Sequence, residues 1–553
     1  MNNARIEVLL YDYDEMMETL SEYLSSAKGV RLDKAADIDM RIARMLPEHI
    51  AKRFCLVAIG EVEDRIVVAM ANPLDVVAQD TVRLKIKREI KVAISSKQEI
   101  LAAIEAIYHG SDLEEERLRN LVERENGTEE EDSSLEDMLE TNISSELAAS
   151  RAPVVQFVDL LLTQAVKNRA SNIHIEPQEH SMIIRMRIDG VLRKMVPPAR
   201  RMQAPVISRI KILSKMDVAE YRLPQDGRFK AKVDDRDIDV RISVIPTKYG
   251  EKVVMRILDP SAINHNLDQL GFEPELLEEF KTILSRPHGM IIVTGPTGSG
   301  KSTTLYSALN YIKDPAKNIT TVEDPIEYSP EEINQIQVKP QIGLNFASCL
   351  RAILRQDPDI ILIGEIRDKE TVEIAIKASL TGHLVLSTFH TNDAPSAISR
   401  LMYMGVEPYL LASTLALIIA QRLVRKVCDR CKEPVTLGEE VLKVLKIEPK
   451  QNRDTVFYHA KGCNDCGGTG YWGRLPVFEF LVIDNDIREK LTAAASESQI
   501  RAMAHKKGYG GLLESGVRKM SQGLTTAEEV LSTTFTESIK VQQCRKAILA
   551  ETA

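Results

Sequence analysis

The chain has 553 residues, of which 44% are hydrophobic and 28% charged. These values are ordinary for a soluble globular protein of three or four domains. A net charge of −9 gives no whole-protein signal for nucleic acid binding. The N-terminus lacks the pattern of a secretory signal. The best membrane candidate, 410–420, is roughly half a bilayer span and is interpreted as a buried core helix. With seven cysteines and no signal, we expect a reducing, cytosolic location.

Residues 1–110 have the pattern of a small α/β module. Helical spacing over 16–24 is followed by strand patterns at 65–70 and 90–94 and by a helix pattern at 98–108. No catalytic constellation is present, so we expect a docking or regulatory domain. Residues 111–150 are acidic and poor in large apolar side chains, which predicts a linker that contains short helical pieces.

Residues 151–265 predict a second, α+β module. An amphipathic helix over 154–166 is followed by alternating strands that begin with 172–176 and 183–188. Asp189-Gly190 is a hairpin signal. Three further strands are predicted at 228–233, 238–244 and 252–258. Arginines recur on these strands, and they either cover an exposed sheet face or meet a nucleotide phosphate: Arg185, Arg187, Arg193, Arg241 and Arg256.

The strongest motif is the P-loop pattern G-x-x-x-x-G-K-S at Gly295–Ser302. It follows the apolar strand 290–293 and precedes a helix pattern at 303–312, which is the context that this motif requires. Glycines let backbone N–H groups surround phosphates at a helix N-terminus. Lys301 would reach the β- and γ-phosphates, and Ser302 would bind Mg²⁺. The predicted nucleotide-binding residues are Gly295, Pro296, Thr297, Gly298, Ser299, Gly300, Lys301, Ser302 and Thr303.

Strand patterns at 318–322, 359–365 and 384–387 follow, and each leads into acidic or polar residues. This arrangement predicts a parallel sheet whose functional ends share one edge. We expect Glu365 at the tip of the strand beside the P-loop, activating water. The usual metal-binding Asp is replaced by Gly364, so Ser302 and carboxylates of 323–327 would hold the metal. His383 and His390 bracket the third strand. A lone histidine is more often a satisfied core residue, but two at this position are interpreted as γ-phosphate sensors rather than metal ligands.

Two CxxC pairs predict a structural zinc site formed by four thiolates: Cys428, Cys431, Cys463 and Cys466. The 31 residues between the pairs, 432–462, exceed the usual ribbon spacing of about 15–20. A predicted helix at 438–445 accounts for this length. A redox disulfide is the alternative. From 484 onward the pattern is mostly helical.

The motifs GPTGSGKSTTLY, TVEDPIEY, LRQDPDIILIGEIRD and TGHLVLSTFHTNDA occur in this order before and beside the CxxC pairs. Together they resemble the type II secretion and type IV pilus ATPase family, closest to its pilus-assembly and secretion branch. The resemblance implies an α/β fold with a RecA-like P-loop ATPase domain at 266–553, a zinc-binding insert at about 425–470, and a PAS-like α+β domain at 151–265. It also implies a hexamer that uses ATP and Mg²⁺ and rotates its domains.

The resemblance also assigns site residues. These are the acidic box with Glu323 and Glu327, the acid Glu365, the histidines His383 and His390, and the phosphate-contacting arginines Arg241, Arg256 and Arg351. Two departures are Asn172, where the family commonly has Asp, and the sequence Pro330–Ile333. The repeats by which some relatives bind cyclic di-GMP are not evident, so we do not predict that ligand.

We therefore expect a cytoplasmic motor at the inner-membrane face, recruited by a platform protein and a docking protein, that powers pilus extension. The nearest alternative is a type II secretion motor, and a retraction motor is disfavoured by the N-terminal module and the cysteines. A nucleic-acid translocase is disfavoured by the acidic charge. A scaffold that binds ATP without hydrolysis is disfavoured by the set of Lys301, Ser302 and Glu365.

Overall fold

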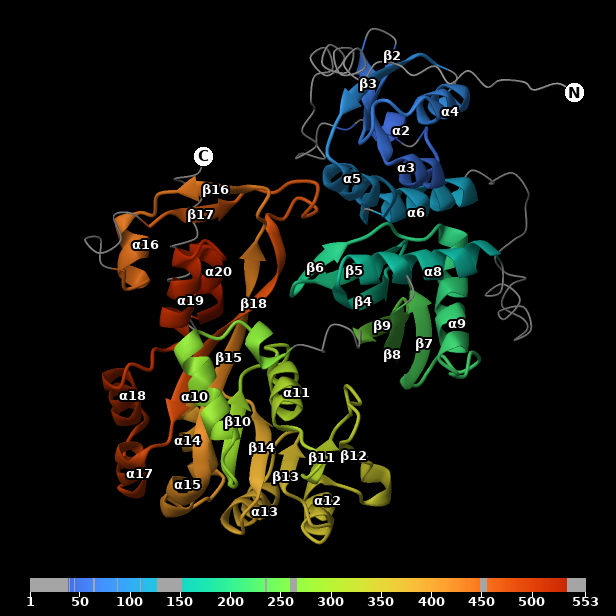
Figure 1. Cartoon of the computed structure of the whole chain (residues 1–553). Helices are drawn as coiled ribbons and strands as arrows, with labels where there is room; N and C mark the ends of the chain where they lie inside the picture. The colour runs from blue at the N-terminus through green and yellow to red at the C-terminus, as the bar shows by residue number, and fades with distance from the viewer. Residues whose placement is uncertain are drawn as a thin grey trace, which may run out of the picture.

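A computed structural model gives the architecture (Figure 1). It describes residues 38, 40–43, 45–62, 65–86, 88–109, 111–126, 152–233, 236–258, 266–447 and 455–534. The described part holds an N-terminal module, a second module and a larger C-terminal domain, each with its own sheet. None of the helices in these residues is long and apolar enough to cross a membrane.

The N-terminal module is a three-stranded sheet with helices. In it β1 (Leu56–Val62) pairs antiparallel with β2 (Arg65–Met70), and β2 pairs parallel with β3 (Ile90–Ile94). The helices are α2 (Met40–Ala43), α3 (Glu48–Phe54), α4 (Val76–Ile86) and α5 (Lys97–His109). The predicted strands at 65–70 and 90–94 and the helix at 98–108 are confirmed. The predicted helix at 16–24 lies outside the described residues.

The first part of the expected linker is instead a helix, α6 (Ser111–Asn126). Its few apolar side chains are spaced along one face, and Leu118 and Val122 are buried in the core of the second module. A small number of apolar residues at helical spacing is enough to bury one stripe of a helix against a neighbour. The prediction of helical pieces is confirmed for 111–126, whereas the burial of this helix against the second module was not expected.

The second module is an antiparallel six-stranded sheet in the order β6-β5-β4-β9-β8-β7, covered by two helices. The predicted helix and strands are confirmed, with one further strand and one further helix. Their bounds are α8 (Ala152–Lys167), β4 (Ala170–Pro177), β5 (Met182–Ile188), β6 (Val191–Lys194), α9 (Gln203–Leu213), β7 (Gln225–Val233), β8 (Arg236–Thr247) and β9 (Gly250–Leu258). Short 3-10 turns occur at Arg200–Met202, Leu267–Gln269 and Pro340–Ile342.

The C-terminal domain is a seven-stranded sheet in the order β12-β11-β13-β14-β10-β15-β18, parallel except for β18. Apolar runs form its buried strands, and helices cover both faces. The strands are β10 (Gly289–Thr294), β11 (Ile319–Glu323), β12 (Asn334–Gln337), β13 (Ile360–Ile363), β14 (Leu384–Phe389), β15 (Leu415–Val427) and β18 (Tyr471–Val482). The helices between them are α10 (Pro274–Leu284), α11 (Lys301–Ile312), α12 (Phe346–Ile353), α13 (Lys369–Leu380), α14 (Ala394–Tyr403) and α15 (Pro408–Thr414).

The apolar run 410–420 is not one helix. It contains the end of α15 and the start of β15, which lies between β10 and β18. A strand buried on both faces is apolar at every position, so its sequence resembles that of a buried helix. The core-helix interpretation was right about burial and wrong about the secondary structure.

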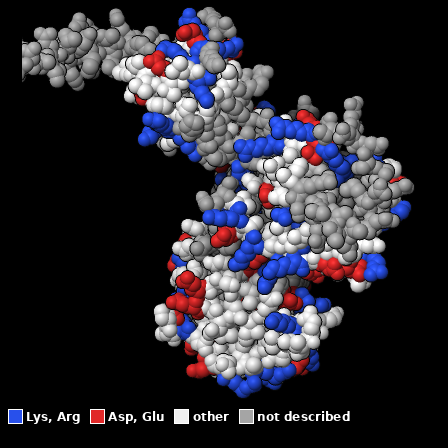
Figure 2. Space-filling view, turned by 90° about the vertical axis from the view of Figure 1, so that its right-hand side faces the viewer, with Lys and Arg blue, Asp and Glu red and all other residues white. Residues whose placement is uncertain are grey.

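A small subdomain protrudes between β15 and β18, formed by β16 (Lys432–Val435), α16 (Glu439–Val444) and β17 (Phe457–Ala460). The helix predicted at 438–445 is confirmed. Four helices end the described chain: α17 (Asn485–Thr492), α18 (Glu497–Lys506), α19 (Leu512–Ser521) and α20 (Ala527–Thr534). Figure 2 shows lysines and arginines lying among acidic side chains on one face of the molecule.

Candidate active site and metal centre

The P-loop joins the buried strand β10 to helix α11, as predicted. Gly295, Gly298 and Gly300 have φ angles of 152°, 80° and 89°, which only glycine adopts readily. A Cβ at Gly298 would meet nothing within 4 Å, whereas one at Gly295 would lie 2.5 Å from the Gln421 carbonyl oxygen. Residues 296–298 and Ser302 are exposed. The loop therefore has a braced base and an open tip at the N-terminus of α11.

Lys301 is folded back into its own loop. Its Nζ donates to the carbonyl oxygens of Gly295, at 2.8 Å, and Pro296, at 3.0 Å. Burial lowers the pKa of Lys301 to about 8, although the charge of Glu365 opposes this and that of Arg422 adds to it. A buried ammonium that bonds only neutral carbonyls gains strongly when an anion arrives. This geometry suits a lysine that exchanges carbonyl partners for phosphate oxygens.

Two residues that the sequence did not single out brace the P-loop from β15. The Gln421 side chain accepts from Thr304 Oγ1 at 2.8 Å and packs against Gly300, where a Cβ would lie 2.7 Å from Nε2. Arg422 donates to the Asn392 carbonyl oxygen at 2.9 Å. In the sequence these two residues are recognisable only as the polar end of an apolar run. Such an end also fits an ordinary strand terminus.

Glu365 follows β13 and lies at the same edge of the sheet as the P-loop. Its side chain is 13% exposed, its Oε2 is 3.2 Å from His390 Nε2, and Arg367 pairs with its Oε1. The carboxylate also feels the charge of Lys301. The prediction that the strand before Glu365 lies beside the P-loop strand is wrong, because β14 separates β13 from β10. Glu365 is therefore two strands away from the P-loop strand.

Gly364 occupies the position where a metal-binding Asp was expected. A Cβ there would lie 3.2 Å from the Glu323 Cα and 3.3 Å from the Val322 carbonyl oxygen. The Gly364 N–H donates to this same carbonyl at 2.7 Å. The close approach of β11 explains why the position carries glycine.

The acidic box divides into a buried and an open part. Glu323 is 5% exposed, and its oxygens accept from Tyr306 Oη, from Thr321 Oγ1 at 2.6 Å and from Gln335 Nε2 at 3.1 Å. Glu327 is more open, with 26% of its side chain exposed. In this arrangement Glu327 is the better placed of the two for a hydrated metal, since Glu323 already has three protein donors.

The two histidines lie at opposite ends of strand β14. His390 follows the carboxyl end of β14, beside Glu365, whereas His383 precedes the amino end of that strand. The Gly289 N–H, at the start of β10, donates to the His383 carbonyl oxygen. His383 Nδ1 lies 2.8 Å from the Ala378 carbonyl oxygen. The expectation for His383 is corrected, because parallel strands put residues at their two ends on opposite edges.

Arg241 and Arg256 are cross-strand partners on one face of the second module, in a row that also contains Asn172 and Arg228. Arg241 reaches the acidic box, where it bonds the Ile326 carbonyl oxygen and lies 3.4 Å from Glu327 Oε1. Arg256 is exposed. The second module thus presents Arg241 to the acidic box. Arg228 was missed because its strand alternates charges like any solvated strand.

Arg351 lies on α12 and pairs with Glu370 at the start of α13. Its side chain is 52% exposed. In the described part of the chain Arg351 bonds Glu370 through its side chain and Arg355 through its carbonyl oxygen. The structure therefore places it at the surface, outside the group formed by Lys301, Glu365 and His390.

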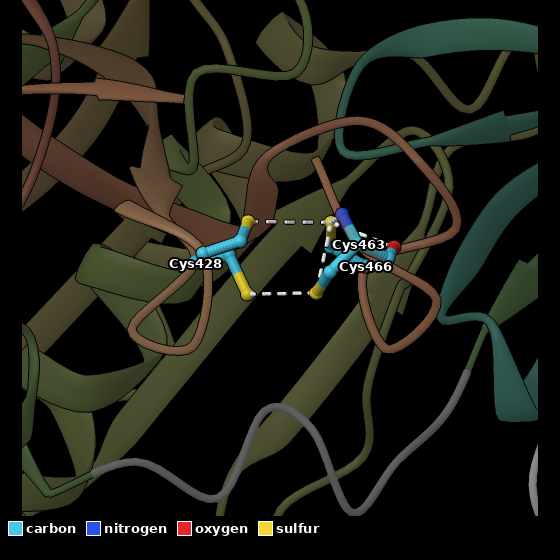
Figure 3. A group of neighbouring side chains, drawn as sticks. Cys428, Cys463 and Cys466 are labelled. Atoms are coloured by element: carbon cyan, nitrogen blue, oxygen red, sulfur yellow. Dashed lines mark hydrogen bonds between the residues drawn. The ribbon is translucent and has the colours of Figure 1, made fainter. Parts of the chain in front are cut away.

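The four predicted cysteine ligands converge between β15 and β18 (Figure 3). Sulfur–sulfur distances are 3.9 Å for Cys428–Cys463, 3.9 Å for Cys431–Cys466 and 3.7 Å for Cys463–Cys466. Zinc bonds of about 2.3 Å in a tetrahedron give sulfur separations of about 3.8 Å. The four sulfurs therefore fit a closed, structural zinc site. Their pairwise distances leave no disulfide among them.

Backbone donors support this centre. The N–H groups of Cys463 and Gly470 point at the Cys466 sulfur, at 3.2 and 3.1 Å. Burial opposes ionisation of Cys466, but these donors outweigh it and lower its pKa to about 7. A lowered thiol pKa favours the thiolate that a metal requires.

Comparisons with known proteins agree with this geometry. Residues 147–532 match the family described as Type II/IV secretion system protein, and residues 30–113 match the MshEN domain. The chain is 42% identical to the type IV pilus assembly ATPase PilB of Myxococcus xanthus, covering 96% of this chain and 94% of that protein. It is also 42% identical to the type II secretion system protein E of Xanthomonas campestris, covering 94% and 90%.

Among solved structures, the chain resembles the Legionella pneumophila ATPase DotB, with a TM-score of 0.50 and 21% identity over 68% of this chain and 94% of that one. This likeness supports the fold. The α/β architecture with a P-loop ATPase core, and the match over 147–532, agree with the two long relatives. The chain belongs to the type II/IV secretion system protein family and is an ATPase of that family.

Proposed function

We propose that this protein is a Mg²⁺-dependent, hexameric motor that powers type IV pilus extension. The observation that carries the proposal is the similarity along nearly the whole chain to a pilus assembly ATPase, including the N-terminal module. The motor would work at the inner-membrane face, bound to a platform protein and a cytoplasmic docking protein. Rotation of the second module against the ATPase domain would convert hydrolysis into movement.

Each site residue has a role in this proposal. Lys301 and the P-loop N–H groups would bind the phosphates, and Ser302 and Glu327 would hold Mg²⁺ with water. Glu365 accepts a proton from the attacking water, while His390 and Arg367 orient its carboxylate. Arg241 and Arg256 bring positive charge from the second module to the charge that develops on the γ-phosphate. Arg351, exposed at the surface, would be the third arginine to contact phosphate. Bound zinc would have a structural role.

A type II secretion motor is the second candidate, since protein E of Xanthomonas campestris matches with the same identity over almost the same span. Both machines would use the same site chemistry, so the partner decides between them. A nucleic-acid translocase is more distant, and turnover stimulated by DNA would support it.

The deciding experiment traps the motor on its partner. Glu365→Gln protein is expressed in the source cells, ATP is added during mild detergent extraction, and co-purifying proteins are identified by mass spectrometry. A polytopic platform protein with pilin-alignment components supports pilus extension. A platform protein with secretin-linked components supports secretion instead, and recovery of neither contradicts both. Lys301→Ala, which lacks the phosphate-binding amine, is the control for partners that bind without nucleotide.

A further inference from the structure

The tetracysteine loop lies against the second module. Arg193 on β6 approaches Gly467, the residue after the ligand Cys466, so closely that a Cβ on Gly467 would lie 3.1 Å from Arg193 Nη1. Figure 1 places the β5–β6 hairpin beside the loop that leads into β18, and Figure 3 shows the ribbon of the second module next to the cysteines. Asp189 of the hairpin and Gly473 of β18 are 284 residues apart in sequence, so the contact is purely tertiary.

Asp189, at the tip of this hairpin, makes the central contact. Its side chain is only 7% exposed, and Oδ2 accepts from the Gly473 N–H at 2.9 Å. Gly473 lies in a β-bulge of β18, where the register against β15 shifts between Tyr471 and Arg474. A residue in a bulge is left unpaired by the ladder, which frees its amide to bond elsewhere. Asp189 supplies the acceptor.

Arginines surround this carboxylate. Arg169 Nη2 lies 3.5 Å from Asp189 Oδ2, and Arg474 Nε lies 4.0 Å from Oδ1. The Arg169 guanidinium also stacks over the Trp472 ring, 4.2 Å from its centroid. One carboxylate of the second module is thus bonded to the backbone of β18, and one arginine of the second module is stacked on the neighbouring indole.

We propose that the tetracysteine centre is a docking platform for the second module of the same chain, and that metal binding to the four cysteines is what keeps this platform in shape. The bonding residues 472–474 follow Cys466 and Gly470 directly. The Cys428 N–H donates to the Gly470 carbonyl oxygen at 2.8 Å, which ties the two cysteine knuckles together next to Trp472. Losing the metal would release these knuckles and so displace the residues that Asp189 and Arg169 contact.

The position of Arg193 fits the negative charge of a zinc centre with four thiolates. Four thiolates around one Zn²⁺ carry a net charge of −2. The Arg193 guanidinium lies against Gly467, next to the ligand Cys466, and its Nε is buried without a hydrogen-bond partner in the described structure. A cation beside the metal centre offsets its negative charge, as outer-shell groups commonly do. This electrostatic attraction would strengthen with metal bound.

Docking at this point affects the active site because both contacts belong to one sheet. The hairpin with Asp189 lies at one edge of the order β6-β5-β4-β9-β8-β7, and Arg241, on β8, touches the acidic box. Two contacts far apart on a rigid sheet fix its orientation better than one. The inference rests on the proposed zinc occupancy, and it makes zinc a determinant of module position as well as of local stability.

The chain contains one fluorescent probe of this contact, and positions at which a side chain can be removed without backbone strain. Trp472 is its single tryptophan, 48% exposed in the docked arrangement, so tryptophan fluorescence excited outside the tyrosine absorption band reports on this contact. Asp189 and Arg169 both have positive φ, 48° and 55°, so glycine removes either side chain without backbone strain. Lys215, an exposed charged residue of the same module with φ of 59°, provides a matched control as Lys215→Gly.

The experiment measures acrylamide quenching of Trp472 and zinc content in the full-length protein, before and after chelation. With zinc bound, Asp189→Gly and Arg169→Gly should raise the quenching constant, whereas Lys215→Gly should match wild type. After chelation, wild type should rise as well, and Asp189→Gly should then differ little from it, because the contact is already lost.

Two results would overturn the inference. One is unchanged quenching in Asp189→Gly while zinc remains bound, which would mean that no docking exists to be lost. The other is an Asp189→Gly effect that persists undiminished after chelation, which would make docking independent of the metal. Protein purified without zinc would contradict the proposed metal occupancy, and the inference with it. The ATPase proposal would be unaffected, since its test is the Glu365→Gln trap.

Discussion

The ammonium group of Lys301 is bonded to the carbonyl oxygen of Gly295, 2.8 Å away at the base of its own loop. Two residues of the P-loop are therefore paired with each other. In the proposed function, bonds from Lys301 to phosphate oxygens would replace this contact when ATP binds. The charged amine is stabilised far more by an anion than by a neutral carbonyl.

We predict that MgATP binding is coupled to proton uptake at Lys301. In the free protein the pKa of Lys301 is about 8 because the side chain is buried, and phosphate charge raises it on binding. Near pH 8 a substantial fraction of the protein should therefore take up one proton. Calorimetry in two buffers with different ionisation enthalpies measures this uptake. The buffer dependence should vanish at about pH 6, where Lys301 is already protonated before binding, and its persistence there would contradict the assignment.

Glu365→Gln should lower ATP turnover by about 10²–10⁴-fold, the usual contribution of a general base. Nucleotide binding should persist, because the P-loop contacts are untouched. Steady-state turnover and binding of a fluorescent ATP analogue separate these effects. Glu373→Gln, an exposed carboxylate on α13 that is 3.7 Å from Lys369, should keep normal turnover. Full activity in Glu365→Gln would show that another group activates water.

Arg241→Ala should reduce turnover at least about tenfold, since a positioned arginine at a γ-phosphate contributes up to about 10³–10⁵ in rate. Arg241→Lys should rescue little, because lysine lacks the fork that spans two acceptors. Lys230→Ala, on the same face of the sheet at the Asp239 position of the register, controls for loss of charge. The assay is turnover per chain against protein concentration. Equal activity of Arg241→Ala and wild type in the assembled form would exclude the role.

Cys466→Ser should release the metal and lower the melting temperature of the C-terminal domain. Structural zinc sites contribute an apparent binding free energy of about 10–16 kcal/mol, and the knuckles pack beside β15 and β18. Zinc content and thermal unfolding check this prediction. Cys55→Ser, a free thiol in the N-terminal module, should keep its zinc. A Cys466→Ser protein with full zinc and unchanged melting would refute the site.

Glu479 should make stability depend on pH. Burial raises its pKa to about 7, with Asp393 adding to the rise and the Ala394 N–H and Arg501 opposing it. Because the folded-state pKa lies above the unfolded value, the contribution to stability is present below about pH 4.5 and is lost as pH rises through about 7. Glu479→Gln cannot ionise, so it should gain on the order of 2–3 kcal/mol relative to wild type between pH 4.5 and 8.

Melting temperatures of wild type and Glu479→Gln at both ends of this range test the prediction. Glu497→Gln is the matched control, since Glu497 pairs with the same Arg501 but is 41% exposed. Its difference from wild type should not change with pH. If Glu479→Gln and wild type keep a constant difference across the range, Glu479 is not the titrating group.

The sequence by itself determined the P-loop and the cysteine ligands. The P-loop residues lie within one short segment of backbone: Gly295, Gly300, Lys301 and Ser302. Each CxxC pair forms a single knuckle. The spacing in the sequence therefore determines the local geometry of both motifs. The strands that carry them were also predictable, because a buried parallel strand is apolar throughout. Strand positions in the second module followed from period-two alternation.

Only the tertiary structure decided which residues meet. It separated His383 from His390 by the length of one strand and placed β14 between the P-loop strand and the strand before Glu365. It showed Glu323 enclosed by donors, Gly364 pressed against β11, and Asp189 bonded to Gly473. These relationships depend on strand order and on packing between distant segments, and local patterns of charge and hydrophobicity carry no record of either.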